Sequence, residues 1–133
     1  MLLYILPAYR PAIQVTATGP AVVHSSDFSV VTAARPDRAG EILSVFATGL
    51  GTVRANVDPG KPFPTNPPAL VNSPVDVLVN GASAEVIAAV GFPNSVGGYQ
   101  VNFRVPSGMS PGMATLQVTA AWIPSSGVSI AIE

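Results

Sequence analysis

Glycine and proline recur so often along this chain that they limit the length of any helix. Fourteen prolines and twelve glycines are spread over the 133 residues. They interrupt the chain at intervals of about eight to twelve residues, a spacing typical of an all-β sandwich. No stretch keeps the 3.6-residue apolar period of a long amphipathic helix. These features predict an all-β fold, an antiparallel β-sandwich of about eight or nine strands.

Residues 40–51 form the clearest predicted strand. Apolar side chains occupy both alternating sets of positions from residue 42 to residue 47, so both faces of a pleated strand would be apolar. A strand of this kind belongs in the interior of a sheet, with a neighbour along each edge. We therefore expect residues 40–51 to be the central strand, delivered by a polar turn at residues 33–39.

Further strands are predicted on both sides of this segment. Asn80 and Gly81 separate two β-rich runs, and this pair favours a two-residue type I′ turn with positive φ at both positions. Residues 99–105 strictly alternate apolar and polar side chains, and we expect them to form an antiparallel hairpin with residues 114–121. The other predicted elements are a first hairpin of residues 12–18 with 21–24, turned by Gly19 and Pro20, and a terminal strand at residues 128–132.

A long irregular segment, residues 52–73, contains five prolines and cannot be a central strand. A loop of this length is unusual in a compact domain. Two alternatives follow: the loop is packed across the sandwich by Phe63 and Leu70, or it is used in binding. The packed alternative is the favoured one.

Composition restricts the partners of the domain. Charged residues make up only 10% of the chain, against roughly 25% in an average soluble domain, and the formal net charge is -1. Without a basic run, the chain is not expected to bind nucleic acid or an anionic membrane. With no cysteine, a disulfide framework and a thiolate metal site are excluded, and we expect no cofactor and no metal.

Length predicts one domain, residues 1–133, with an opening strand and the first hairpin in residues 1–23. The apolar start reaches Pro7 after six residues, too short for a signal peptide or for membrane insertion. We expect the domain to be a part excised from a larger chain with other domains.

Catalytic chemistry has few candidates in this sequence. His24 is the only histidine, and a Ser-His-Asp triad would combine it with Asp27, although there is no Gly-x-Ser-x-Gly motif. A histidine that ends a strand at a local turn is the favoured interpretation. Asp76 and Glu85 could form a carboxylate pair across a hairpin, but two solvated carboxylates are more common. We therefore predict no catalytic residue.

Aromatic and amide side chains are the best candidates for binding. Flat apolar rings next to planar hydrogen-bonding groups are typical of sandwiches that bind sugars or proteins. Tyr99 shares its parity with Val101 and Phe103 and is expected in the core. Trp122 is either packed at an edge or an exposed platform. The polar face formed by Gln100, Asn102, Arg104, Gln117 and Thr119, here called the amide face, is either a ligand site or a solvated sheet surface. The candidate ligand-binding residues are Trp122, Gln100, Asn102, Arg104 and Gln117.

Several segments, in their order and spacing, resemble a known family. They are residues 26–29 (Ser-Asp-Phe-Ser), 40–51 (Gly-Glu-Ile-Leu-Ser-Val-Phe-Ala-Thr-Gly-Leu-Gly), 72–75 (Asn-Ser-Pro-Val), 79–81 (Val-Asn-Gly), 84–86 (Ala-Glu-Val) and 99–106 (Tyr-Gln-Val-Asn-Phe-Arg-Val-Pro). From residue 24 to residue 133 the chain is similar to an uncharacterised C-terminal domain of large exported proteins of Solibacter-type acidobacteria. More distantly, it resembles the immunoglobulin-like (IPT/TIG) domains of plexins and transcription factors.

This resemblance implies an immunoglobulin-like β-sandwich of an extracellular or cell-surface protein. It implies neither an enzymatic activity nor any residue roles. The predicted function is therefore a non-catalytic accessory or interaction module, acting in adhesion, surface attachment or assembly with a protein or glycan partner. The alternative is a carbohydrate-binding module that uses Trp122 and the amide face. A second alternative is a fragment of a hydrolase that depends on His24.

Overall fold

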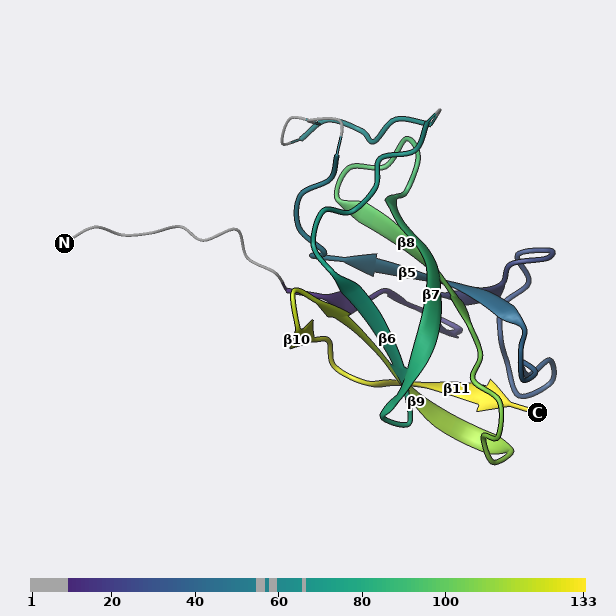
Figure 1. Ribbon diagram of the computed structural model, residues 1–133. Helices are drawn as coiled ribbons and strands as arrows, with labels where there is room; N and C mark the ends of the chain where they lie inside the picture. The colour runs from purple at the N-terminus through teal and green to yellow at the C-terminus, as the bar shows by residue number, and fades with distance from the viewer. Residues whose placement is uncertain (1–9, 55–56, 58–59, 66) are drawn as a thin grey trace.

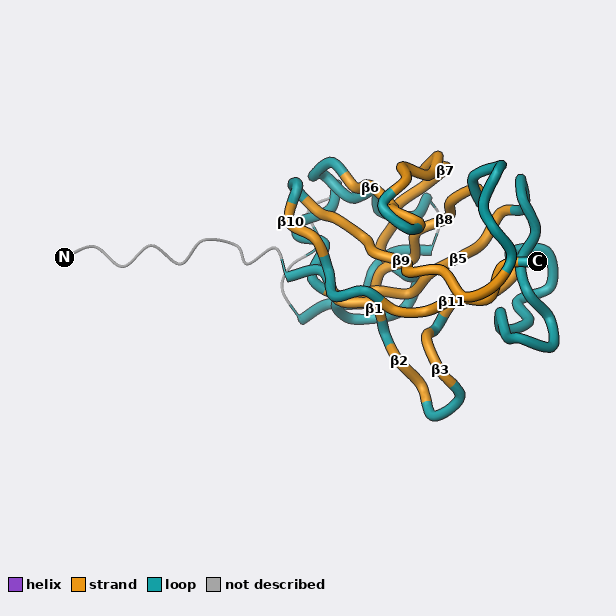
Figure 2. The backbone as a smooth tube through the Cα atoms, turned by 90° about the horizontal axis from the view of Figure 1, so that it is seen from below, coloured by secondary structure: helices purple, strands orange, loops and turns teal. Residues whose placement is uncertain are grey.

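The computed structural model describes residues 10–54, 57, 60–65 and 67–133, and its strands are shown in Figures 1 and 2. These residues contain no helix, and the named strands pair only in antiparallel fashion. The strands are β1 (Ala12–Ile13), β2 (Val15–Thr16), β3 (Gly19–Pro20), β4 (Val22–His24), β5 (Ile42–Thr48), β6 (Val75–Val79), β7 (Ala82–Gly91), β8 (Gly98–Arg104), β9 (Gly112–Ala120), β10 (Ile123–Pro124) and β11 (Val128–Ile132). The predicted antiparallel all-β class is confirmed, with additional strands of only two or three residues.

The long strand β7 joins the two halves of the fold. Its beginning pairs with β6, and its remainder, from Glu85 onward, pairs with β8. This second pairing is interrupted by a register shift between Val86 and Ala88. Nine strands follow one continuous order, β1-β5-β8-β7-β6-β9-β10, with β4 also on β5 and β11 also on β9. Strand β7 divides this order into two sheets, one with β8, β5, β4 and β1 and the other with β6, β9, β10 and β11. Because β7 belongs to both, the sheets curl around one core into a sandwich-like half-barrel (Figure 1).

The core lies between these two sheets. Leu43, Val45 and Ala47 of β5 are completely buried, as are Phe103 of β8 and Leu116 of β9. Full burial of a large apolar side chain stabilises the fold by about 1.5 to 3 kcal/mol. Strand β5 has β1 and β4 on one edge and β8 on the other, so its predicted interior position is confirmed.

The turn between β6 and β7 has the predicted geometry. Asn80 and Gly81 have φ values of 49° and 78°, and the flanking residues Val79 and Ala82 are paired. Asn80 also binds the neighbouring strand β9, because its Oδ1 accepts the Thr115 N–H at 2.7 Å and its own N–H donates to the Thr115 carbonyl at 2.8 Å. This turn is therefore anchored as well as correctly shaped.

The predicted hairpin of residues 99–105 with 114–121 is wrong. Strand β8 pairs with β5 and β7, whereas β9 pairs with β6, β10 and β11. The connection from Val105 to Pro111 therefore crosses from one sheet to the other. Alternation with a period of two determines which side chains are buried, but it does not specify which strand lies alongside.

The predicted first hairpin is also largely wrong. Only β2 and β3 pair with each other, around a turn at Ala17 and Thr18, while β1 and β4 each pair with β5. Figure 2 shows the β2–β3 hairpin projecting away from the sandwich. Val15 is accordingly 67% exposed, although it shares the parity of buried Ile13. The opening strand predicted before Pro7 lies outside the described residues.

The proline-rich loop is packed onto the sandwich by Phe63, as predicted, but not by Leu70. The Phe63 ring is buried and lies 5.3 Å from the ring of Tyr99, centroid to centroid. Gly91 makes this packing possible, since a Cβ there would lie 2.4 Å from the Phe63 ring. Leu70 is 44% exposed, and the neighbouring Ala69 is buried in its place.

Candidate functional site

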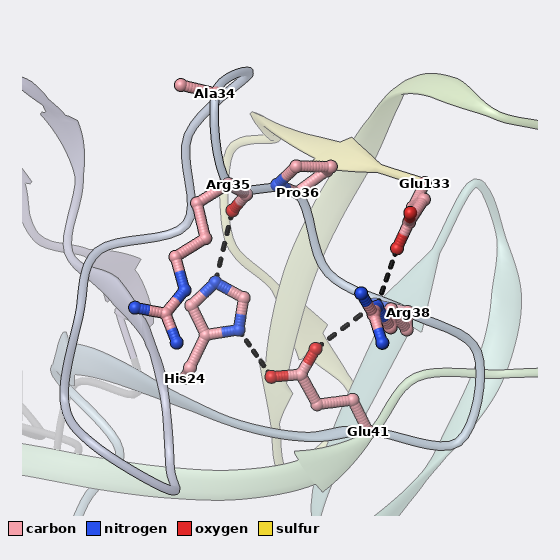
Figure 3. Close-up of a pocket in the computed structure, with 7 residues that line it drawn as sticks. All are labelled: His24, Ala34, Arg35, Pro36, Arg38, Glu41 and Glu133. Carbon is pink, nitrogen blue, oxygen red and sulfur yellow. Dashed lines mark hydrogen bonds and ion pairs between the residues drawn. The ribbon is translucent and has the colours of Figure 1, made fainter.

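A polar cleft of about 460 Å³ lies between the end of β4, the segment that precedes β5 and the residue that follows β11 (Figure 3). Two of its side chains are arginines and two are glutamates, so it is rich in charge for a chain with so few charged residues. The lining residues are His24, Ala34, Arg35, Pro36, Arg38, Glu41 and Glu133.

His24 is the most enclosed of these residues, with 3% of its surface exposed. Its Nδ1 contacts a carboxylate oxygen of Glu41, and its Nε2 lies 3.1 Å from the backbone carbonyl oxygen of Arg35. Both nitrogens therefore face an acceptor, as Figure 3 shows. The ring is therefore held from both sides, by the Glu41 side chain and by the backbone of Arg35.

Glu41 and Arg38 extend this arrangement to the mouth of the cleft. The second oxygen of Glu41 accepts the Arg38 N–H at 3.1 Å, which closes the turn before β5. The Arg38 Nε donates to the Glu133 carboxylate at 2.7 Å. Both side chains of that ion pair are more than half exposed, so the pair contributes at most about 1 kcal/mol to stability.

Residues 33–39 form the predicted polar turn, with every residue but one exposed or half-buried, and the exception is Asp37, which is completely buried. Neither of its carboxyl oxygens has a hydrogen-bond partner in the described part of the chain. Burial, together with the negative charge of Glu41, raises the pKa of Asp37 to about 6, while the nearby His24 opposes the rise. A neutral carboxyl tolerates such a site far better than a carboxylate does.

The cleft does not contain the Ser-His-Asp arrangement that His24 and Asp27 could in principle have formed, which the sequence analysis disfavoured. The Asp27 carboxylate accepts bonds from the backbone and hydroxyl of Ser29 and from Arg35, and the Ser29 bonds are the main reason that the pKa of Asp27 falls to about 2. Glu41, not Asp27, is the partner of His24. Among the described residues that line the cleft, none carries a hydroxyl group. His24 ends β4, as predicted, and its backbone carbonyl accepts the Phe28 N–H in the following turn at 2.8 Å. Its side chain binds Glu41 and the Arg35 carbonyl instead of this turn.

The predicted amide face lies on the outer side of β8. There the Asn102 side-chain oxygen accepts bonds from the Ser44 hydroxyl at 2.7 Å and from the Gln100 amide at 3.0 Å. Arg104 lies at the end of the same strand and binds the Glu85 carboxylate at 3.0 Å. These polar groups are therefore largely occupied by one another.

The other two predicted binding residues lie in the second sheet. Gln117 is on β9, and its amide donates to the Ser125 carbonyl at 3.0 Å. Trp122 lies in the two-residue turn between β9 and β10 and is 77% exposed. Of the two alternatives for Trp122, the exposed platform is confirmed. The structure does not bring Trp122 and the β8 amide face into one sheet.

A smaller pocket of about 290 Å³ was missed by the sequence analysis. It lies beside the rings of Phe46 and Phe92, which meet edge to face with centroids 5.3 Å apart. Its lining is mostly apolar and holds no ionisable group apart from the hydroxyl of Tyr99. That hydroxyl donates to the Gly51 carbonyl, and burial raises the pKa of Tyr99.

The described residues contain neither a cluster of metal-binding side chains nor a long apolar helix. No three histidine, cysteine, aspartate or glutamate side chains there are grouped so that they could hold a metal ion. In the same part of the chain, no helix is long and apolar enough to cross a membrane. Comparison of the chain with protein-family models, with curated proteins and with solved structures found no match.

Proposed function

We propose that this domain is a non-catalytic interaction module that contacts its partner through the β9–β10 hairpin, with Trp122 at the tip. The observation that carries the proposal is the exposure of this indole, 77%, on a turn in which neither residue is glycine. A single exposed apolar side chain needs no explanation by itself. The backbone conformation that presents it does.

Ala121 and Trp122 have φ values of 48° and 65°. A left-handed conformation costs a non-glycine residue about 1 to 2 kcal/mol, and such strain is concentrated at functional positions. In exchange, the turn presents a large rigid ring with only two side-chain torsions. Tryptophan is enriched among the residues that dominate binding energy at interfaces. Ile123, 45% exposed, extends the apolar surface of the hairpin.

The geometry of the cleft supports a non-catalytic role. A general base needs a free ring nitrogen within reach of a nucleophile, and both nitrogens of His24 already face acceptors. A hydrolase mechanism based on His24 would need the Arg35 carbonyl to move away and a nucleophile to come from elsewhere. The hydrolase alternative has no such support in the described residues.

The carbohydrate alternative depends on the same indole. Its amide component is weaker, because Gln100 and Asn102 bind each other and Ser44. A glycan would therefore stack on Trp122 without help from that face. An extracellular or cell-surface setting, with a role in adhesion, attachment or assembly, is supported only by the resemblance to domains of exported proteins.

Trp122 is the only tryptophan in the chain, so intrinsic fluorescence reports on this side chain alone. We would titrate the domain with purified bacterial surface proteins and with cellulose, xylan, chitin and peptidoglycan fragments. Binding should shift the emission to shorter wavelength, and Trp122→Ala should abolish binding measured by calorimetry. Val15→Ala, at a position that is 67% exposed on the other hairpin, is the matched control and should bind normally. Binding that survives Trp122→Ala would overturn the proposal, and a response limited to the glycans would select the carbohydrate alternative.

A further inference from the structure

Asp37 connects two segments that are far apart in the sequence. Its backbone N–H donates to the Ala131 carbonyl of β11 at 3.0 Å, and its carbonyl accepts the Glu133 N–H at 2.8 Å. Together these bonds form a parallel bridge to Ile132. Figure 1 shows the loop between β4 and β5 beside the end of β11. The side chain of the residue that makes this connection is the buried carboxyl group without a partner.

We propose that residues 34–41 and the end of β11 form a proton-controlled latch, closed when the Asp37 carboxyl is protonated and loosened when it ionises. The physical reason is that a buried carboxylate without a hydrogen bond is costly in free energy. This cost disappears when the segment opens, because water then hydrates the carboxylate. Opening lets Asp37 reach solvent and breaks its two backbone bonds to β11. The latch is independent of the Trp122 hairpin.

The charged groups around Asp37 come from three parts of the fold. His24 lies at the end of β4 and favours the ionised form, whereas Glu41, just before β5, disfavours it. Glu133, after β11, directs its carboxylate to Arg38, and the Arg35 guanidinium is directed to Asp27. No arginine therefore binds Asp37 itself among the described residues.

The sign of the pH effect follows from these groups. Burial and Glu41 raise the pKa of Asp37 from 3.8 to about 6 in the folded domain. The closed latch therefore binds this proton more tightly than the open one. Its stabilisation is complete below a pH of about 4 and is lost as the pH rises through about 6. The latch should be closed at mildly acidic pH and should open more often at neutral pH.

Loosening has a structural consequence at β11. The backbone of Asp37 is hydrogen-bonded to the Ala131 carbonyl in β11 and to the N–H of Glu133, the residue after the strand. An uncovered strand edge can pair with an extended segment of another chain. The latch would therefore make the end of β11 available for strand pairing at neutral pH and close it in acid.

Hydrogen exchange of single amides, measured by NMR on the whole domain, tests the latch. We would follow the N–H groups of Asp37 and Glu133 at pH 5 and pH 7.5, with rates corrected for the intrinsic effect of pH. Their protection should fall about tenfold between these values, the change in opening that a pKa of about 6 instead of 3.8 implies. Protection that does not change with pH would overturn the proposal.

Asp37→Asn supplies the neutral side chain permanently. In this variant both amides should stay protected at pH 7.5 as at pH 5, whereas Asp76→Asn, at an exposed position on β6, should keep the wild-type response. A tenfold change that persists in Asp37→Asn would assign the effect to His24 or Glu41 and contradict the latch. Should that variant fail to fold, titration of the Asp37 carboxyl carbon in the wild-type domain decides: a midpoint near 6 is required, and one near 4 refutes the proposal.

Discussion

Two turns of this protein share a backbone geometry and differ in chemistry. Asn80 and Gly81 join β6 to β7 with φ values of 49° and 78°, and Ala121 and Trp122 join β9 to β10 with 48° and 65°. Asparagine and glycine are the residues that this type of turn favours, because both tolerate positive φ. Alanine and tryptophan are not favoured in this type of turn.

The side chains of the two turns also do different things. Asn80 accepts a hydrogen bond from the backbone of β9, so the first turn contributes to the packing of the second sheet. Trp122 directs most of its surface to solvent. The first turn is suited to folding, whereas the second gives up stability to hold one aromatic ring at the surface. This difference is the main physical support for placing the binding surface at Trp122.

The largest effect on stability should come from placing the residues of the second turn, alanine and tryptophan, at the positions of the first turn, Asn80 and Gly81. The double variant Asn80→Ala/Gly81→Trp introduces two left-handed costs and removes the bond between Asn80 and Thr115. We expect the free energy of unfolding to fall by about 3 kcal/mol, measured by urea denaturation. A loss below about 1 kcal/mol would show that the two positions do not differ in strain.

The reverse exchange should have a smaller and opposite effect on stability. Ala121→Asn/Trp122→Gly gives the second turn the favoured residues and should raise the free energy of unfolding by about 1 to 2 kcal/mol. The same variant should no longer bind the partner. Higher stability combined with lost binding is the signature of a functional compromise, and unchanged or lower stability would argue against strain at this turn.

The smallest effect on stability is expected for Trp122→Ala. The indole is 77% exposed, and alanine keeps the same left-handed cost, so the free energy of unfolding should change by less than about 0.5 kcal/mol. Thermal and urea unfolding provide the measurement. In the wild-type domain, acrylamide should quench the fluorescence almost as well as in a free peptide. A destabilisation above about 1.5 kcal/mol would mean that Trp122 packs against the domain and is not a free platform.

Local patterns in the sequence predicted the parts of the fold that depend on neighbouring residues. The Asn80 and Gly81 turn follows from the φ preferences of two residues, and the burial of Tyr99, Val101 and Phe103 follows from strict alternation. The interior position of β5 follows from apolar side chains on both faces. None of these features requires knowledge of a distant partner.

The candidate sites were predicted less well, for a physical reason. No spacing rule links His24 to Glu41, which are 17 positions apart, and Asp37 lies between charged residues that suggest a solvated turn. Trp122 was identified as a candidate by its residue type, but the sequence around it could not decide whether its ring is exposed or packed.

The sequence by itself determined the all-β class, the faces of the long strands and one turn, because these follow from side-chain size, alternation and backbone preference over a few residues. Tertiary structure alone decided that β8 and β9 do not pair with each other. It also decided that Asp37 is buried against β11 and that the Trp122 side chain is exposed. Strand pairing and burial depend on contacts between residues far apart in the chain, and such contacts are selected by the packing of the whole core.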